Sequence, residues 1–70
     1  MKLSARNQIK GTVQAIKIDQ IMAEVTVGLP GGGSLVSVIT AESARSLGLT
    51  QGMSVIVVIK STEVMLATED

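Results

Sequence analysis

Apolar and polar residues alternate along much of the chain, and this alternation predicts short β-strands. Apolar side chains fall at every second position in the first half of residues 7–19, and again in 22–28 and 34–39. Residues 53–59 are apolar at nearly every position, which is typical of a strand covered on both faces. Residues 64–67 form a further short apolar run. The pattern therefore predicts five strands.

Local signals between these runs predict how they are joined. Gly11, together with a break of phase near Ala15, predicts a bulge or bend in the first strand. Asp19 marks a turn, and Thr40 has the character of a helix N-cap. Gly48 stands where a left-handed stop would end that short helix. Five strands with one helix between the third and fourth predict a mainly β fold, a small OB-like Greek-key barrel that forms a single domain over residues 1–70.

The composition indicates that this domain needs help to be stable. A chain of 70 residues buries only roughly 60% of the surface that it exposes when unfolded. It has no Cys for disulfides or thiolate metal sites, and no His, the commonest metal ligand. Because 46% of the residues are hydrophobic, oligomerisation is the stabilising device that remains.

Several classes of function and location are disfavoured by what the sequence lacks. There is no Phe, Tyr or Trp to stack on bases, and the formal net charge is zero, so a nucleic-acid partner is not expected. Apolar runs are too short for a membrane span, and no apolar signal segment follows Met1-Lys2. A cytoplasmic protein is therefore the expectation.

Catalysis is also disfavoured. Without His or Cys the familiar nucleophile–base pairs cannot be built. The six carboxylates lie apart in the sequence at turns, on polar strand faces or in the tail, as solvated surface charges do. The glycine run at 31–34 lacks the Gly-Lys-Ser/Thr ending of a phosphate loop and precedes a strand, so it is interpreted as a hairpin turn.

Three polar segments carry the remaining chemistry, at 4–8, 39–43 and 60–62. A buried tetrahedral dianion needs opposing charge, several donors and preferably the free amides at the start of a helix. From these segments we take two cations and four hydroxyls as candidate ligands, on Arg6, Lys60, Ser4, Thr40, Ser43 and Ser61. Each segment also has a plainer interpretation, namely a frayed terminus, an ordinary helix cap and a polar turn. For each segment alone the plainer interpretation is favoured, and it is the family resemblance described next that favours a non-catalytic oxyanion site.

The same segments carry a resemblance to a known family. The run Ser4-Ala5-Arg6-Asn7-Gln8 before Lys10-Gly11, the run at 39–44 with Leu47-Gly48-Leu49, and the run at 59–62 are similar, in order and spacing, to the molbindins. These are single Mop domains that bind molybdate. The resemblance covers the whole chain. It implies non-covalent binding of molybdate or tungstate at subunit interfaces, with the metal held only as the oxyanion. Some members are called molybdopterin-binding proteins, but this chain has no aromatic side chain for a pterin, so no organic cofactor is expected.

The resemblance also implies an assembly and a set of binding residues. Mop domains exchange strands and form a trimer of dimers, so a homo-hexamer is expected. Carried over by motif, one chain would bind the oxyanion through its N-terminal and C-terminal segments, with backbone amides at Ala5 and Ser61, and the partner chain would bind it through the middle segment. The implied binding residues are Ser4, Ala5, Arg6, Lys60 and Ser61 from one side, and Thr40 and Ser43 from the other.

Three functions remain open on the sequence. The first is intracellular storage or buffering of molybdate, which the three-segment constellation favours. The second is a regulatory or assembly module for another molybdenum-related protein, with the anion as effector, which the apolar surface favours. The third is an OB-type nucleic-acid binder, which the missing aromatics and the zero net charge disfavour.

Overall fold

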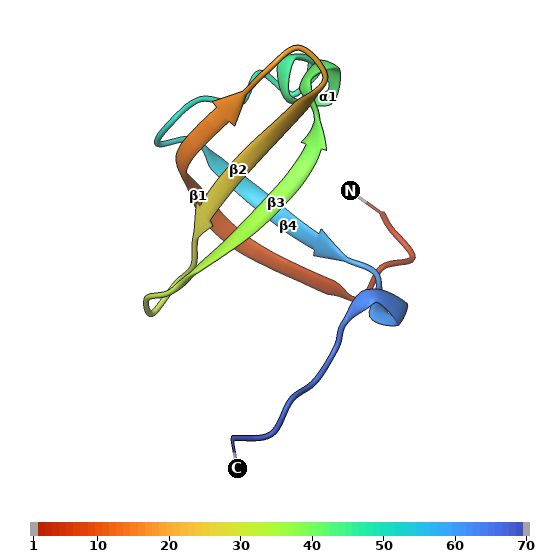
Figure 1. The fold of residues 1–70 in the computed structure, drawn as a ribbon. Helices are drawn as coiled ribbons and strands as arrows, with labels where there is room; N and C mark the ends of the chain where they lie inside the picture. Colours follow the sequence, from red (N-terminus) through yellow and green to blue (C-terminus); the bar gives the residue numbers. More distant parts are fainter. Residues whose placement is uncertain (1, 70) are drawn as a thin grey trace.

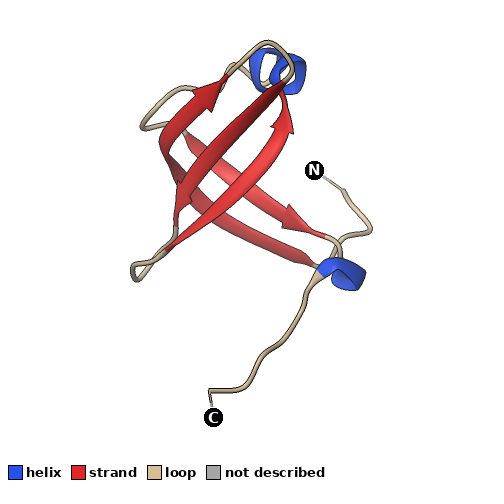
Figure 2. Cartoon of the chain, in the orientation of Figure 1, coloured by secondary structure: helices blue, strands red, loops and turns tan. Residues whose placement is uncertain are grey.

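The computed structural model describes residues 2–69, and its main feature is one antiparallel sheet of four strands in the order β3-β2-β1-β4 (Figures 1 and 2). The sheet is strongly curled (Figure 2). The elements are β1 (Asn7–Ile18), β2 (Met22–Gly28), β3 (Ser34–Thr40), the helix α1 (Ala41–Ser46), β4 (Ser54–Ile59) and a single 3₁₀ turn, η1 (Ser61–Glu63).

The long strand β1 belongs to both halves of the curled sheet. Its first half pairs with β4, from Asn7 opposite Ile59 to Thr12 opposite Ser54. Its second half pairs with β2, and the register shifts between Val13 and Ala15. This irregularity confirms the bend predicted near Ala15. A bulge of this kind increases local twist, which lets one strand serve two directions of the sheet.

Gly11 is required by a close approach between β1 and β2. A Cβ atom at this position would lie 2.5 Å from Val27 Cγ1 and 2.8 Å from the Gly28 carbonyl oxygen. Both distances are shorter than real Cβ contacts. The residue is buried and its backbone conformation is not unusual, so it is the space that demands glycine here.

The core is small and consists of branched aliphatic side chains. Val13, Val25 and Val27 form its fully buried centre on the concave side of the sheet. Partly buried residues from β1, β3, β4 and the segment after α1 pack around them, namely Ile16, Ile39, Leu49, Val55 and Val57. After the bulge the inward-facing residue of β1 is Ile16, whereas the predicted pattern placed Ala15 on that face; the shift of register reverses the alternation.

The helix α1 begins and ends as predicted. Thr40 is its N-cap, in an extended conformation, and its side chain accepts a hydrogen bond from the Ser43 amide. Gly48 has φ of +64°, the left-handed conformation that ends helices at little cost for glycine. Ala41 and Ala44 form the buried face.

The predicted fifth strand is absent from the described residues. After η1 the chain runs away from the sheet (Figure 1), and residues 64–69 have no strand assignment. The four-stranded sheet is also not closed into a barrel, because β3 and β4 are its unpaired edges. A strand needs a free sheet edge to pair with, and the single chain does not bring residues 64–67 to one.

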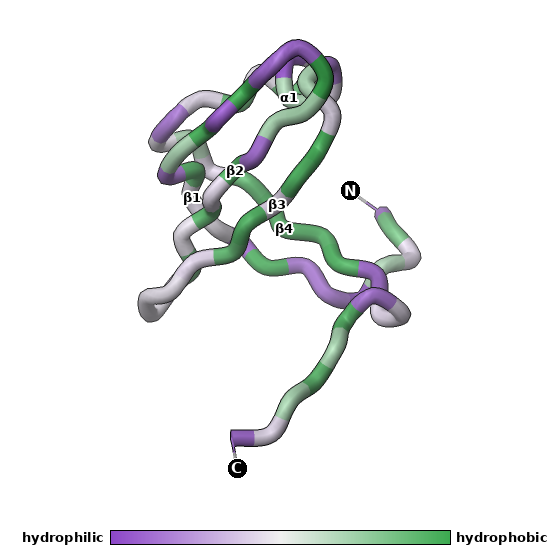
Figure 3. Tube along the Cα trace, viewed as in Figure 1, coloured by the Kyte–Doolittle hydropathy of each residue, from purple (hydrophilic) through white to green (hydrophobic). Residues whose placement is uncertain are grey.

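Apolar side chains remain exposed on the single chain. The outward residues of β4, Ile56 and Val58, are 50% and 42% exposed, so the predicted covering of this strand on both faces is not met by one chain. In the C-terminal segment, Met65 and Leu66 are 91% and 94% exposed. Figure 3 shows this apolar segment standing clear of the sheet. Across residues 2–69 there is no helix long and apolar enough to cross a membrane.

Candidate functional site

The pairing of β1 with β4 brings two predicted binding segments together. Asn7 opposite Ile59 is the last pair of this ladder. Arg6 precedes one member of the pair and Lys60 follows the other, so the two cations occupy adjacent backbone positions. Ser4 and Ala5 lead into Arg6, and Ser61 opens η1 directly after Lys60. Segments more than fifty residues apart in sequence therefore meet at one end of the sheet.

The backbone at this end is held by local hydrogen bonds. The Gln8 side-chain amide donates to the Ala5 carbonyl at 2.9 Å, which fixes the approach to β1. The Glu63 amide donates to the Lys60 carbonyl at 2.9 Å and closes η1. Ser4, Arg6, Lys60 and Ser61 are exposed, and Ala5 is half-buried. These bonds lower the cost of ordering the backbone on binding, whereas the exposed Arg6 and Lys60 side chains still have to be ordered.

The two cations have no anionic partner within the part of the chain that the structure describes. Among residues 2–69, neither Arg6 nor Lys60 makes a side-chain hydrogen bond or ion pair. Both side chains are exposed and lack an anionic partner among the described residues, so both are available to a bound anion at this end of the sheet.

Thr40 and Ser43 form a second polar group, at the start of α1. The Thr40 hydroxyl oxygen accepts a hydrogen bond from the Ser43 amide at 3.0 Å, and the same hydroxyl donates to Ser43 Oγ at 2.7 Å. The Thr40 hydroxyl proton is therefore engaged in the bond to Ser43 Oγ, whereas the Ser43 hydroxyl proton has no acceptor among the described residues. Ser43 is the hydroxyl donor that this pair can offer to a ligand.

The backbone amides expected as donors at the start of α1 are largely engaged. The Ala41 amide donates to the Ile21 carbonyl at 2.7 Å, and the Ser43 amide is bonded to Thr40. The sequence predicted a helix start with free amides. The structure instead connects this helix start to the loop between β1 and β2, so side-chain hydroxyls are the main donors here.

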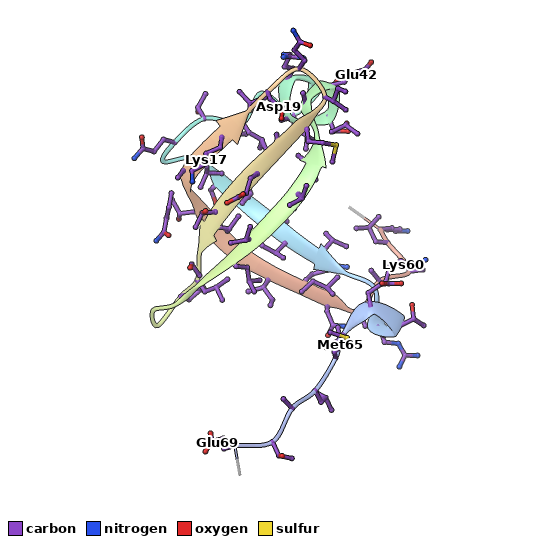
Figure 4. All side chains as sticks on the ribbon, viewed as in Figure 1. Lys17, Asp19, Glu42, Lys60, Met65 and Glu69 are labelled. Atoms are coloured by element: carbon purple, nitrogen blue, oxygen red, sulfur yellow. The ribbon has the colours of Figure 1, made fainter. Side chains whose placement is uncertain are left out.

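One chain does not unite the two polar groups. The Arg6–Lys60 group lies where β1 begins and β4 ends, and the Thr40–Ser43 group lies at the opposite end of the curled sheet (Figure 1). In Figure 4, Lys60 marks the first end, while Asp19 and Glu42 mark the end that carries α1. The seven predicted residues therefore fall into two separate groups, Ser4–Arg6 with Lys60–Ser61, and Thr40 with Ser43, which are named half-sites for the predicted oxyanion site.

The sequence interpretation missed the role of Asp19. It was treated only as a turn marker, yet one oxygen of its carboxylate accepts hydrogen bonds from the Ile21 and Met22 amides, both at 2.8 Å. The amides of Met22 and Ile21 lower the pKa of the Asp19 carboxyl below its usual value. An Asp two and three residues before free amides is a recognisable sequence signal of this turn.

The hollows of the surface add no further chemistry of this kind. A groove of about 410 Å³ beside the bulge is lined by Lys10, Gly11, Gln14, Pro30 and Ser54, among others. Lys10 is the one cationic residue in this lining. An apolar hollow of about 200 Å³ opens from the concave side of the sheet, over Val13, Val25 and Val57. Within residues 2–69 there is no group of three or more His, Cys, Asp or Glu side chains that would hold a metal ion.

Comparison with known proteins gives consistent matches over nearly the whole chain. The sequence profile of the TOBE domain family matches residues 3–66. Molybdenum-pterin-binding protein 3 of Clostridium pasteurianum is 44% identical over 66 residues, which cover 94% of this chain and 97% of that protein.

Solved structures agree with the sequence matches. A molybdate-binding protein from Sporomusa ovata superposes with a TM-score of 0.91 at 34% identity, over 97% of this chain and all of that one. The cytoplasmic molybdate-binding protein ModG, solved with molybdate bound, superposes with a TM-score of 0.81 at 45% identity, over 94% of this chain and 53% of that chain.

The chain belongs to the TOBE domain family. Within that family it is a Mop domain of the molbindin type, as its likeness to full-length relatives of the same size demonstrates. The resemblance drawn from the three motifs is thereby confirmed. The relatives are named as binding proteins.

Proposed function

We propose that this protein binds molybdate or tungstate non-covalently, as an intracellular store of the oxyanion. The observation that carries the proposal is the pair of cations, Arg6 and Lys60, which flank the last β1–β4 pair and have no anionic partner among residues 2–69. Two of the similar structures are described as molybdate-binding proteins, which supports this choice of anion.

The charges and donors match a tetrahedral dianion. Two cations against two negative charges give a neutral site, which avoids the cost of unpaired charge when the site is covered. Arginine donates two hydrogen bonds in a fixed plane, and Lys60, Ser4 and Ser61 add further donors. The chain has no aromatic side chain for a pterin ring, so we propose the bare oxyanion and no organic cofactor.

We propose binding rather than catalysis. The half-sites contain no His or Cys, and no carboxylate is among their residues. A general base or nucleophile for hydrolysis or transfer is therefore missing from them. The protein returns the anion unchanged.

Surface area supports an oligomer. The single chain exposes 5671 Å², whereas a compact monomer of 7.2 kDa exposes roughly 4,100 Å². Its radius of gyration is 13.0 Å, against about 11 Å expected for a compact chain of this length. The excess is typical of a subunit that shares its core with neighbours. We propose a homo-hexamer, a trimer of dimers.

The C-terminal segment is the proposed exchanged strand. It runs outward from η1 with Met65 and Leu66 exposed, and the sheet has free edges at β3 and β4. Pairing of residues 64–67 with an edge of another chain would supply the fifth strand and close the OB-like Greek-key barrel of the single domain, residues 1–70. This exchange would also cover outward residues of the sheet.

The same assembly would complete the binding site. The Arg6–Lys60 half-site of one chain would face the Thr40–Ser43 half-site of another, since one chain holds them at opposite ends. An anion bound between chains stabilises the oligomer over its separate subunits. Occupancy of the anion site and assembly of the oligomer would therefore be coupled.

Calorimetric titration with molybdate, tungstate, sulfate and phosphate tests the proposal. We expect molybdate and tungstate to bind more tightly than the other two anions. Arg6→Ala and Lys60→Ala should each weaken binding about tenfold to hundredfold, because a charge-assisted hydrogen bond contributes about 1.5–3 kcal/mol.

Lys17→Ala is the matched control, because it removes one exposed cation from the far half of β1. It should leave the affinity unchanged. A wild-type protein that binds no molybdate, or that binds all four anions equally, would contradict the proposal.

A further inference from the structure

We propose that Asp19 is a positioning residue of the oxyanion site, which holds the Thr40–Ser43 half-site in place from the loop between β1 and β2. The inference rests on the proposed function and deepens it. It assigns a role to a residue that lies outside the three binding segments.

The loop is organised around a single carboxylate oxygen. Asp19 Oδ1 accepts hydrogen bonds from both the Ile21 amide and the Met22 amide at 2.8 Å. The Asp19 amide in turn donates to the Met22 carbonyl at 2.9 Å. These bonds fix the backbone of residues 19–22 and therefore the direction in which the Ile21 carbonyl points.

The Ile21 carbonyl is the acceptor for the first amide of α1. The Ala41 amide donates to it at 2.7 Å. On the next strand position, Met22 pairs with Thr40 across the β2–β3 ladder. The loop therefore fixes Ala41, which follows Thr40 in the sequence, and Met22, which lies opposite Thr40 in the sheet. Ala41 itself is buried.

The connection ends at the Ser43 hydroxyl. Thr40 accepts from the Ser43 amide and donates to Ser43 Oγ, so the position of Thr40 determines where the Ser43 hydroxyl lies and leaves its one proton available to a ligand. Asp19 is therefore joined to the Ser43 hydroxyl through three consecutive steps: the hydrogen bond from the Met22 amide, the Met22–Thr40 strand pair and the Thr40–Ser43 hydrogen bond. Figure 4 shows Asp19 on the same end of the molecule as Glu42 of α1.

A carboxylate suits this place although it adds negative charge near an anion site. An oxygen that accepts hydrogen bonds from two amides at 2.8 Å forms stronger bonds when it carries the negative charge of a carboxylate. The lowered pKa of Asp19 reflects the same two bonds. Asn keeps the oxygen acceptor, so Asp19→Asn is the conservative variant, and Asp19→Ala removes the acceptor.

A double-mutant cycle with molybdate as the probe separates positioning from a general loss of stability. We expect Asp19→Ala to weaken molybdate binding about tenfold in the wild-type background, but less than twofold in a Ser43→Ala background. In a Ser61→Ala background, which alters the other half-site, the tenfold effect should persist. Asp19→Asn should restore most of the wild-type affinity.

Amide hydrogen exchange on the anion-free protein gives a readout that does not depend on binding. Asp19→Ala should speed exchange at Ile21, Met22 and Ala41, while the buried amides of Val25 and Val27 stay protected and demonstrate that the variant is folded. Glu24→Ala, which removes an exposed carboxylate of β2, should change neither exchange at Ala41 nor affinity.

The outcomes distinguish the two claims. Wild-type protein that fails to bind molybdate overturns the proposed function, and this inference with it. Wild-type binding with unchanged affinity in Asp19→Ala overturns the inference alone. An equal loss on Asp19→Ala in the Ser43→Ala and Ser61→Ala backgrounds also overturns it, because Asp19 would then act on the whole fold.

Discussion

At the scale of single residues, the binding chemistry is visible in the sequence and its geometry is not. Arg6, Lys60 and the serines beside them are conspicuous in a chain that is 46% hydrophobic. The sequence did not reveal that the Thr40 hydroxyl donates to Ser43 Oγ, or that the Ala41 amide donates to the Ile21 carbonyl. Both bonds depend on how the loop between β1 and β2 packs against the start of α1. The division of labour between Thr40 and Ser43 follows from those bonds.

Substitutions at these two residues should therefore have different consequences. Ser43→Ala removes the available donor and should weaken molybdate binding about five- to tenfold, because a hydrogen bond contributes about 1 kcal/mol. Thr40→Ala removes the helix cap and should lower the free energy of unfolding by about 1 kcal/mol. Calorimetry and denaturant unfolding measure the two quantities. An equal loss of stability in both variants would contradict this assignment.

Asp19 should contribute to the acid sensitivity of the fold. Its folded pKa is lowered by the Met22 and Ile21 amides, so its contribution to stability is complete above the unfolded pKa, about 3.9. The contribution is lost as the pH falls through the lower, folded value. Melting temperatures measured from pH 6 down to pH 2.5 should fall less steeply for Asp19→Asn than for wild type. Parallel curves would contradict this role.

At the scale of elements, periodicity and turn chemistry located four strands and the helix closely. The observed β2 has the predicted bounds, and the Thr40 cap and Gly48 stop are as expected. Prediction failed at residues 64–67, where an apolar run indicates a strand but the single chain offers no edge to pair with. Local pattern encodes the tendency to be a strand, and only the assembly supplies the partner.

The close approach of β1 to β2 is a consequence at this scale that can be measured. Gly11→Ala would place a methyl group against Val27 Cγ1 and the Gly28 carbonyl. We expect a loss of about 1–3 kcal/mol in the free energy of unfolding, as in other overpacked cores. Thr12→Ala, an exposed neighbour on β1, is the control and should cost much less. Equal values from denaturant unfolding would show that the strands can separate freely.

At the scale of the whole molecule, the single chain leaves apolar side chains and two sheet edges uncovered. Its exposed surface exceeds that of a compact monomer, and its apolar C-terminal segment lies outside the sheet. The predicted binding residues are likewise divided between the two ends of the sheet. The proposed oligomer would complete both, which is why neither was evident from one chain's pattern.

A charge placed in the C-terminal segment tests the proposed exchange. Leu66 is 94% exposed in the single chain, so Leu66→Asp costs nothing there and is costly only if the side chain is buried by a neighbour. We expect the variant to have a lower sedimentation coefficient than the wild type, because the hexamer dissociates into smaller species. Gln51→Asp, in the exposed turn before β4, adds the same charge and should leave the assembly intact. A monomeric wild type would contradict the exchange.

The central claim is that one oxyanion binds between two chains, with each chain contributing a different half-site. The most direct measurement is a crystal structure of the molybdate complex with anomalous diffraction recorded at the molybdenum edge. The account predicts an anomalous peak at a subunit interface, bounded by Arg6 and Lys60 of one chain and by Ser43 of another. A peak surrounded by residues of a single chain, or no peak near Arg6 and Lys60, would contradict it.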